Sequence, residues 1–124
     1  MQRCPCQSGL PYAECCEPFH LGHSPAPTAE RLMRSRYSAF AVGAVDYLLA
    51  TWHPSTRPDE LSLDPDVRWT SLEILGRTRG GMLDSVGTVE FRANYRSDGG
   101  RGSQHETSTF RRENRIWLYV DALR

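Results

Sequence analysis

The amino-acid sequence predicts an α+β fold, in which helices pack on an antiparallel sheet, preceded by a small metal-binding module. Three observations lead to this prediction. All four cysteines lie within the first 20 of the 124 residues. Apolar residues then recur at helical spacing between residues 29 and 52. After Pro65 they alternate with polar residues as in half-buried strands, and helices followed by consecutive strands are typical of α+β domains.

The cysteines form two close pairs with the spacing C-x-C-x8-C-C, and we predict a closed, structural zinc site among Cys4, Cys6, Cys15 and Cys16. Such sites hold zinc with four thiolate or imidazole ligands in a tetrahedron, and a short loop between two ligand pairs allows that geometry. Reduced free thiols and disulfides are the alternatives, although a bridge between adjacent cysteines is strained. Adjacent cysteines both bind one metal only if the backbone turns between them, so His20 is a reserve ligand.

The module is expected to occupy residues 1–24, because the prolines of Ser24-Pro25-Ala26-Pro27 continue neither a helix nor a central strand. Residues 28–124 then form the α+β domain. Its first helix is predicted over 29–42, with a threonine cap before it and a glycine stop after it.

A second helix is predicted over 44–52, because His53 precedes a proline and is therefore disfavoured in helical geometry. Residues 59–61 could add a helical turn. Turn-forming clusters separate the strands that follow, and we interpret residues 99–102 as a flexible hairpin tip. The four predicted strands cover residues 67–79, 87–96, 105–112 and 115–123.

The charge balance gives no bulk attraction to nucleic acid or to anionic membranes. The 15 basic residues, all arginine, equal the 15 acidic residues in number. No apolar run approaches the ~18 residues of a membrane span, and the first residues do not have the pattern of a signal peptide. We therefore expect a cytoplasmic protein, and in that reducing compartment a cysteine cluster is more often a metal site than a set of disulfides.

The pattern C-P-C-x-S-G-x-x-Y-x-x-C-C over residues 4–16 resembles the SEC-C zinc-binding motif. The segments LMRSRYSAF (32–40), DYLLATWHPS (46–55) and IWLYVD (116–121) resemble the YchJ family of uncharacterised bacterial proteins, which have the same SEC-C head. This resemblance covers essentially the whole chain. It implies a nuclear-transport-factor-two-like (NTF2-like) domain, a cone of curved antiparallel sheet of about four strands wrapped over N-terminal helices. It also assigns zinc to all four cysteines.

The sequence departs from the SEC-C motif at two places. Gln7 replaces the usual glycine after the second cysteine, where a positive backbone φ would cost about 1 kcal/mol. Residues 10–14 also lack the basic side chains that SEC-C loops use to engage protein or ribosome partners. Charge-driven docking through this loop is therefore not expected.

Arg36 is predicted to lie within the apolar stripe of the first helix, beside Tyr37, and not on the solvated face with Arg34, Ser35 and Ser38. An arginine in such a position needs a partner. One interpretation is a structural cation bound to a carboxylate or to backbone carbonyls. The other is an anion anchor at the mouth of a cone-shaped pocket.

Trp52 and His53 end the second helix and are further pocket candidates. His53 could cap the helix carbonyls, where a cation is favoured by the helix dipole. Alternatively it is an acid or base beside a Trp52 pocket wall, which requires a carboxylate to orient the imidazole ring. The candidates for this carboxylate are Glu73, Glu90 and Glu106.

These features favour a zinc-containing binding or adaptor protein over an enzyme, because the sequence contains no nucleophile elbow, phosphate loop or paired carboxylates at fixed spacing. Its cone domain would bind a ligand, a second copy or another protein. An isomerase- or dehydratase-like enzyme using the cone pocket is the first alternative. A ribosome- or nucleic-acid-associated factor is the second, with Trp69 and Trp117 as stacking residues, and zero net charge argues against it.

Overall fold

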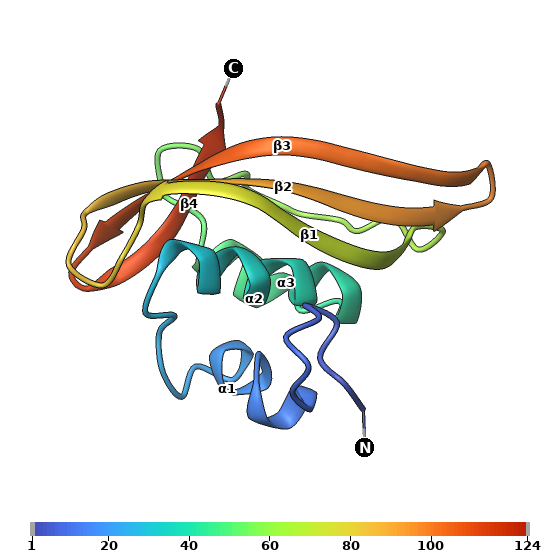
Figure 1. Ribbon diagram of the computed structural model, residues 1–124, viewed down its shortest axis with the longest axis horizontal. Coiled ribbons are helices and arrows are strands. Elements are labelled where there is room, and N and C mark those ends of the chain that lie inside the picture. Colours follow the sequence, from blue (N-terminus) through green and yellow to red (C-terminus); the bar gives the residue numbers. More distant parts are fainter. Residues whose placement is uncertain (1, 124) are drawn as a thin grey trace.

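Four antiparallel strands form a single curved sheet in the computed structural model, which describes residues 2–123 (Figure 1). The strands follow one another across the sheet in the order β1-β2-β3-β4. This meander over the helices confirms the predicted α+β fold. The strands are β1 (Arg68–Arg79), β2 (Val86–Ser97), β3 (Gly100–Glu113) and β4 (Ile116–Ala122).

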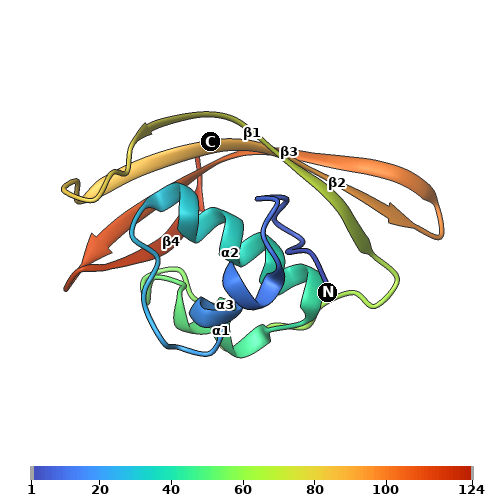
Figure 2. The same cartoon turned by 60° about the horizontal axis from the view of Figure 1, so that its bottom comes forward.

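The helical elements are η1 (Tyr12–Glu14), α1 (Glu17–His20), α2 (Ala29–Val42) and α3 (Val45–Ala50). They lie on one side of the sheet, with α2 and α3 nearest to it and α1 farther away (Figures 1 and 2). The bounds of α2 match the prediction. Thr28 Oγ1 accepts a hydrogen bond from the Arg31 amide at 3.1 Å, and Gly43 ends the helix with a φ of 81°. No helix within residues 2–123 is long and apolar enough to cross a membrane.

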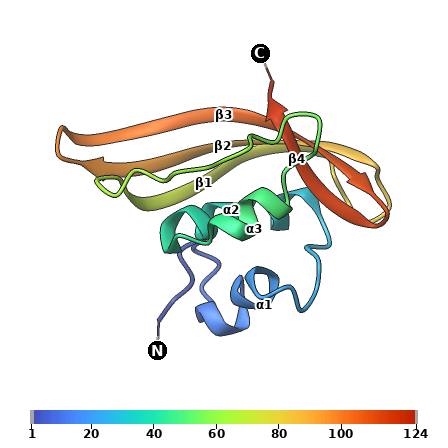
Figure 3. The same cartoon turned by 180° about the vertical axis from the view of Figure 1, so that it is seen from behind.

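The second helix is shorter than predicted, because the chain after Ala50 pairs with the edge of the sheet. The Tyr119 amide donates to the Thr51 carbonyl at 2.8 Å, and the His53 amide donates to the Tyr119 carbonyl at 2.7 Å. Figure 3 shows this segment passing beside β4 before it returns to the start of β1. The helical turn predicted at 59–61 is wrong, since this stretch has no regular structure.

The hairpin tip predicted at 99–102 is only partly correct. Gly99 lies in the turn, but β3 begins at Gly100 and pairs with β2 from its first residue. Gly102 lies opposite Tyr95. A Cβ atom at Gly102 would be 2.6 Å from the Tyr95 ring, so the aromatic side chain occupies the space that the glycine leaves. The glycine therefore serves cross-strand packing, while the chain reverses at residues 98–99.

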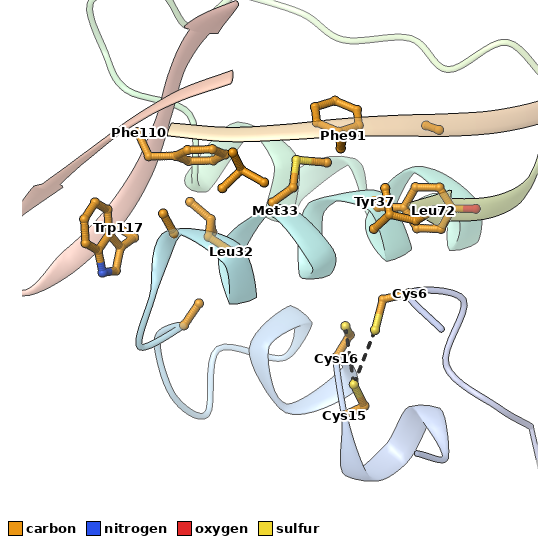
Figure 4. Close-up of a cluster of buried hydrophobic side chains, with 14 of the residues drawn as sticks. Cys6, Cys15, Cys16, Leu32, Met33, Tyr37, Leu72, Phe91, Phe110 and Trp117 are labelled. Carbon is orange, nitrogen blue, oxygen red and sulfur yellow. Dashed lines mark hydrogen bonds between the residues drawn. The ribbon is translucent and has the colours of Figure 1, made fainter. Parts of the chain in front are cut away.

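The core lies between α2 and the concave face of the sheet (Figure 4). Alternate residues of β2 are buried there, as its period-two pattern predicts. The opposite face of α2 is not solvated, contrary to the sequence prediction. Ser35 and Ser38 on that face are fully buried, because the cysteine module packs over them. The helix is thus enclosed between two layers.

Candidate functional site

The four cysteines converge in one buried cluster beside α2. Their sulfur atoms all lie within 4.8 Å of one another, and all four thiols are free. The Sγ atoms of Cys6 and Cys15 are 3.6 Å apart, and those of Cys15 and Cys16 are 3.9 Å apart (Figure 4). Zinc–sulfur bonds of about 2.3 Å in a tetrahedron place sulfurs about 3.8 Å apart. The cluster therefore has the ligand types and spacing to hold a metal ion.

The local backbone brings the two cysteine pairs together. A tight turn follows Cys4, whose carbonyl accepts from the Gln7 amide at 3.1 Å, and the Cys4 amide donates to the Leu10 carbonyl at 2.9 Å. Cys15 ends η1 with a φ of −119° and a ψ of −93°, while Cys16 begins α1 in helical geometry. The chain thus turns between the adjacent cysteines, as binding of one metal by both requires.

The electrostatics of the cluster favour a bound cation. Hydrogen bonds with Cys16 and Cys6 lower the pKa of the Cys4 thiol well below its usual range. Hydrogen bonds with Cys4 and Cys6 raise the pKa of Cys16. One thiolate is therefore stabilised by its protonated neighbours, whereas four buried thiolates require a positive ion among them.

Two arginines from α2 supply positive charge around the cysteine loops. Arg31 Nη2 lies 3.7 Å from Cys15 Sγ, and Arg34 Nη1 donates to the Cys6 carbonyl at 2.9 Å. Burial lowers the pKa of Arg31, but the thiols of Cys15 and Cys16 outweigh it and raise the pKa overall. Hydrogen bonds of this kind around metal ligands orient the ligands and stabilise their charged form.

His20, the reserve ligand, has both ring nitrogens in hydrogen bonds outside the cluster. Its Nε2 donates to the Ser35 carbonyl at 2.8 Å, so Nδ1 accepts from the Tyr12 hydroxyl at 2.6 Å. Burial lowers the pKa of His20, which favours the neutral ring. In this arrangement the imidazole joins α1 and η1 to α2.

Gln7 connects the module to the free edge of β1. Its φ is 65°, the positive value considered from the sequence. Its side-chain Nε2 donates to the Thr70 carbonyl at 3.2 Å, and its Oε1 accepts from the Leu72 amide at 3.4 Å. A glycine at this position would remove the strain and both of these hydrogen bonds.

On the other side of α2, a cavity of about 250 Å³ opens between the helix and the sheet. Of the residues that the sequence nominated, Arg36, Tyr37 and Trp52 line this cavity, and His53 does not. Glu106, one of the three carboxylate candidates, and Trp69, a candidate stacking residue, also line it. The remaining lining residues were not singled out from the sequence, because their orientation depends on the curvature of the sheet. They are Met33, Phe40, Phe91, Ala93, Gln104, Ser108 and Tyr119.

Arg36 is 4% exposed, and within residues 2–123 no carboxylate forms an ion pair with it. Its Nη1 donates to the Leu48 carbonyl at 2.8 Å and to Thr51 Oγ1 at 2.7 Å. The guanidinium carbon lies 5.0 Å from the ring centroid of Trp52 and 4.7 Å from that of Tyr119. Burial lowers the pKa of Arg36 to about 10, so it remains a cation at neutral pH.

His53 lies outside the cavity and has a carboxylate partner that the sequence did not indicate. Its Nδ1 accepts from the Ser55 amide at 3.1 Å, and its Nε2 donates to Glu113 Oε2 at 2.8 Å. The three carboxylates proposed from the sequence have other partners: Glu73 pairs with Arg92, Glu90 with His105, and Glu106 with Ser108 and Gln104. Glu113 lies between two of the predicted strands, where a turn was expected. The pairing of β3 with β4 places it next to His53.

The fold and the cysteine cluster together define the class of protein, an NTF2-like domain joined to a SEC-C motif. A family model of the SEC-C motif matches residues 2–18, and one described as "YchJ, middle NTF2-like domain" matches residues 28–122. The chain belongs to this YchJ family. The similar bacterial proteins are named UPF0225 proteins.

The relatives match over nearly their whole length. The UPF0225 protein of Streptomyces coelicolor is 53% identical over 118 residues, which is 95% of this chain and 92% of the relative. That of Corynebacterium glutamicum is 55% identical over 118 residues, 95% of this chain and 94% of the relative. The chain is therefore similar to these proteins in both its cysteine module and its sheet domain.

Two solved structures of SEC-C motif containing proteins have the same fold. The solution structure from Rhodopseudomonas palustris superposes with a TM-score of 0.85 at 35% identity and covers 98% of both chains. The crystal structure from Psychrobacter arcticus has a TM-score of 0.82 at 31% identity, over 98% of this chain and 81% of that one. The packing of a cysteine-rich head on an NTF2-like body is thus shared with experimentally determined structures.

Proposed function

We propose that this protein is a zinc-containing binding protein, with a structural zinc in the SEC-C module and a ligand-binding surface in the NTF2-like domain. The observation that supports it best is the closed cluster of four buried sulfurs on α2. Tetrahedral sulfur sites are typical of zinc or iron, and four thiolates leave zinc no open position for a reacting water. Free buried thiols also suit the reducing conditions of the cytoplasm.

The two alternative functions have weaker support. An enzyme would need an acid or base in the cavity, and His53 is paired with Glu113 outside it. The sheet carboxylate Glu106 does line the cavity, but it accepts hydrogen bonds from Ser108 and Gln104 and has no imidazole beside it in the lining. A nucleic-acid factor would need exposed stacking residues, but Trp117 is 1% exposed and Trp69 lines the cavity. A protein partner or a second copy of the chain belongs to the same proposed binding role.

Metal analysis of the full chain, purified without chelator, tests this proposal. We expect one zinc per chain and thiols that react with a thiol reagent only after the metal is removed. Protein without bound metal and with freely reactive thiols would overturn the proposed zinc site. Iron found in place of zinc would show that the cysteines form an iron site.

Two substitutions identify the ligands. Cys16→Ser is expected to reduce zinc retention in the presence of a chelator, because it removes a thiolate ligand. His20→Gln is the matched control, since its ring makes hydrogen bonds outside the sulfur cluster and its loss leaves all four thiols in place. A His20→Gln protein that loses zinc as Cys16→Ser does would show instead that the imidazole is a ligand.

A further inference from the structure

The cavity beneath α2 is lined by side chains from all three segments on which the family resemblance rests. Arg36 comes from 32–40, Trp52 from 46–55, and Tyr119 from 116–121. They meet at one place, with the Arg36 guanidinium carbon within 5.0 Å of both ring centroids. These segments are distant in the sequence, so the fold itself assembles the group.

Two residues that line the cavity, Arg36 and Trp52, have hydrogen-bond donors that no acceptor within residues 2–123 satisfies. Both hydrogen bonds of Arg36 run from Nη1, and its positive charge has no carboxylate partner there. A guanidinium offers five N–H donors in a fork that matches a carboxylate. The indole Nε1 of Trp52 is also buried and has no hydrogen-bond partner among residues 2–123. Most buried donors in proteins have a partner, either another protein group or an ordered water, so a donor without one is open to a ligand acceptor.

The rest of the cavity suits an apolar body. Tyr37, Phe40 and Tyr95 contact the indole of Trp69 through tilted or edge-on rings with centroids 5.5–6.3 Å apart. Phe91 and Met33 also line the cavity. Its volume of about 250 Å³ is near the lower end of small-molecule sites, which span roughly 300–1,000 Å³. A ligand here is therefore small and largely aromatic or aliphatic.

Glu106 determines how such a ligand would be oriented. It lines the cavity from β3 and accepts hydrogen bonds from Ser108 Oγ at 2.6 Å and Gln104 Nε2 at 3.3 Å. Its negative charge disfavours a second anion beside it. A ligand carboxylate is accordingly favoured next to Arg36, with any hydroxyl group of the ligand near Glu106.

We propose that this cavity binds a small monocarboxylate with an aromatic or aliphatic body, whose carboxylate accepts hydrogen bonds from Arg36 and from the Trp52 indole. This inference rests on the proposed binding role of the NTF2-like domain and adds the chemical class of the ligand. It does not depend on which metal the cysteines hold.

Phenylacetate and its neutral analogue phenylacetamide test the role of charge in the wild-type, metal-loaded full chain. The readout is the NMR signal of the Trp52 indole N–H, assigned by its loss in Trp52→Phe, together with a calorimetric titration. We expect phenylacetate to shift this signal and to bind at least about tenfold more tightly than the amide, because only the acid pairs with the guanidinium. Equal affinities, or an indole signal that neither compound moves, would overturn the proposal. Inorganic phosphate that binds as tightly as phenylacetate would overturn the requirement for an apolar body.

Variants test the two donors separately. Arg36→Met is expected to weaken phenylacetate binding by about tenfold or more. Trp52→Phe keeps an aromatic ring and removes only the donor, so we expect it to weaken binding by several-fold.

Arg92→Met, on the outer face of β2, is the matched control and should bind as the wild type does. If Arg36→Met does not fold, Trp52→Phe and the acid–amide comparison still decide the question. Unchanged affinity in Trp52→Phe would remove the indole from the site.

Metal content, measured on the same samples, separates this inference from the proposed zinc site. A protein that holds zinc with protected thiols but binds no carboxylate would overturn the cavity inference alone. A protein that binds phenylacetate but contains no metal would overturn the zinc proposal and leave the cavity inference in place.

Discussion

At the scale of single residues, two side chains adopt costly states that their neighbours offset. Gln7 has a positive φ, and its amide joins the cysteine module to the edge of β1 through two hydrogen bonds. Arg36 is a buried cation whose partners are neutral groups and aromatic rings. Both residues lie at junctions between layers, where a local cost can be offset by contacts that are distant in the sequence.

Substitution of Gln7 separates backbone strain from hydrogen bonding. Gln7→Ala keeps the strained φ and removes both hydrogen bonds, whereas Gln7→Gly removes the strain as well. The glycine variant is therefore expected to be about 1 kcal/mol more stable than the alanine variant. Urea unfolding of the zinc-loaded proteins measures this difference. Equal free energies of unfolding would show that the positive φ carries no cost here.

The stability of Arg36→Met distinguishes a structural cation from a ligand anchor. A charge in a buried ion pair costs about 3–5 kcal/mol when its partner is left behind unpaired. Arg36 leaves no carboxylate behind in residues 2–123, and its removal also relieves the desolvation of a cation. The Leu48 carbonyl and Thr51 Oγ1 do lose a charged donor, so we expect Arg36→Met to lower the free energy of unfolding by about 1–3 kcal/mol. A loss above 3 kcal/mol in chemical unfolding would identify a structural role instead.

At the scale of elements, three arginines form a row across neighbouring strands of the sheet, although the chain is neutral overall. Arg96 lies directly opposite Arg68 on one neighbouring strand and Arg101 on the other. None of the three forms an ion pair within the described residues. Like charges directly opposite one another destabilise a sheet.

Arg96→Thr is accordingly expected to raise the free energy of unfolding by about 0.5 kcal/mol at low salt, and by less at high salt, where the repulsion is screened. Arg92→Thr is the control on the same strand. Arg92 Nη1 lies 3.6 Å from Glu73 Oε2, so its removal breaks an ion pair and does not relieve repulsion between arginines. Denaturant unfolding at two ionic strengths measures both. A destabilised Arg96→Thr at low salt would contradict the expectation.

At the scale of the whole molecule, α2 is the wall shared by two sites. One side of the helix faces the cysteines through Arg31, Arg34 and Ser38, and the other side supplies Arg36 and Tyr37 to the cavity. Figure 4 shows the sulfurs on one side of α2 and the apolar core on the other. The cysteine module therefore completes the burial of a helix that the sheet covers on one side only.

Removal of the metal is expected to destabilise the cysteine module first, then α2, and the sheet last. Without the metal the four sulfurs lose the bonds that hold the two cysteine pairs together, so residues 2–20 should lose protection from hydrogen exchange first. The amides at the module-facing side of α2 should follow, while the paired centre of β2 and β3 stays protected. Hydrogen exchange with and without chelator measures this order. Equal loss of protection in the sheet would contradict a structural role confined to the module.

The sequence predicted the features that have local causes. A threonine cap and a glycine stop define the bounds of α2, alternating side chains indicate the strands, and cysteine spacing indicated that the four cysteines cluster. Its errors lie where a distant partner intervenes. The second helix ends early because Thr51 and His53 pair with β4, and residues 100–102 are ordered because they pair with β2.

Local sequence patterns were thus enough to predict the class of fold, the order of its elements and the set of cysteines, since short-range geometry governs each of these. Contacts between distant parts of the chain were needed to show that His53 meets Glu113 across 60 residues and that Gln7 reaches β1. The same holds for Arg36, which is buried with no carboxylate as an ion-pair partner among residues 2–123. The physical reason is that strand register and layer packing, which no local pattern encodes, select the partner of each buried polar group.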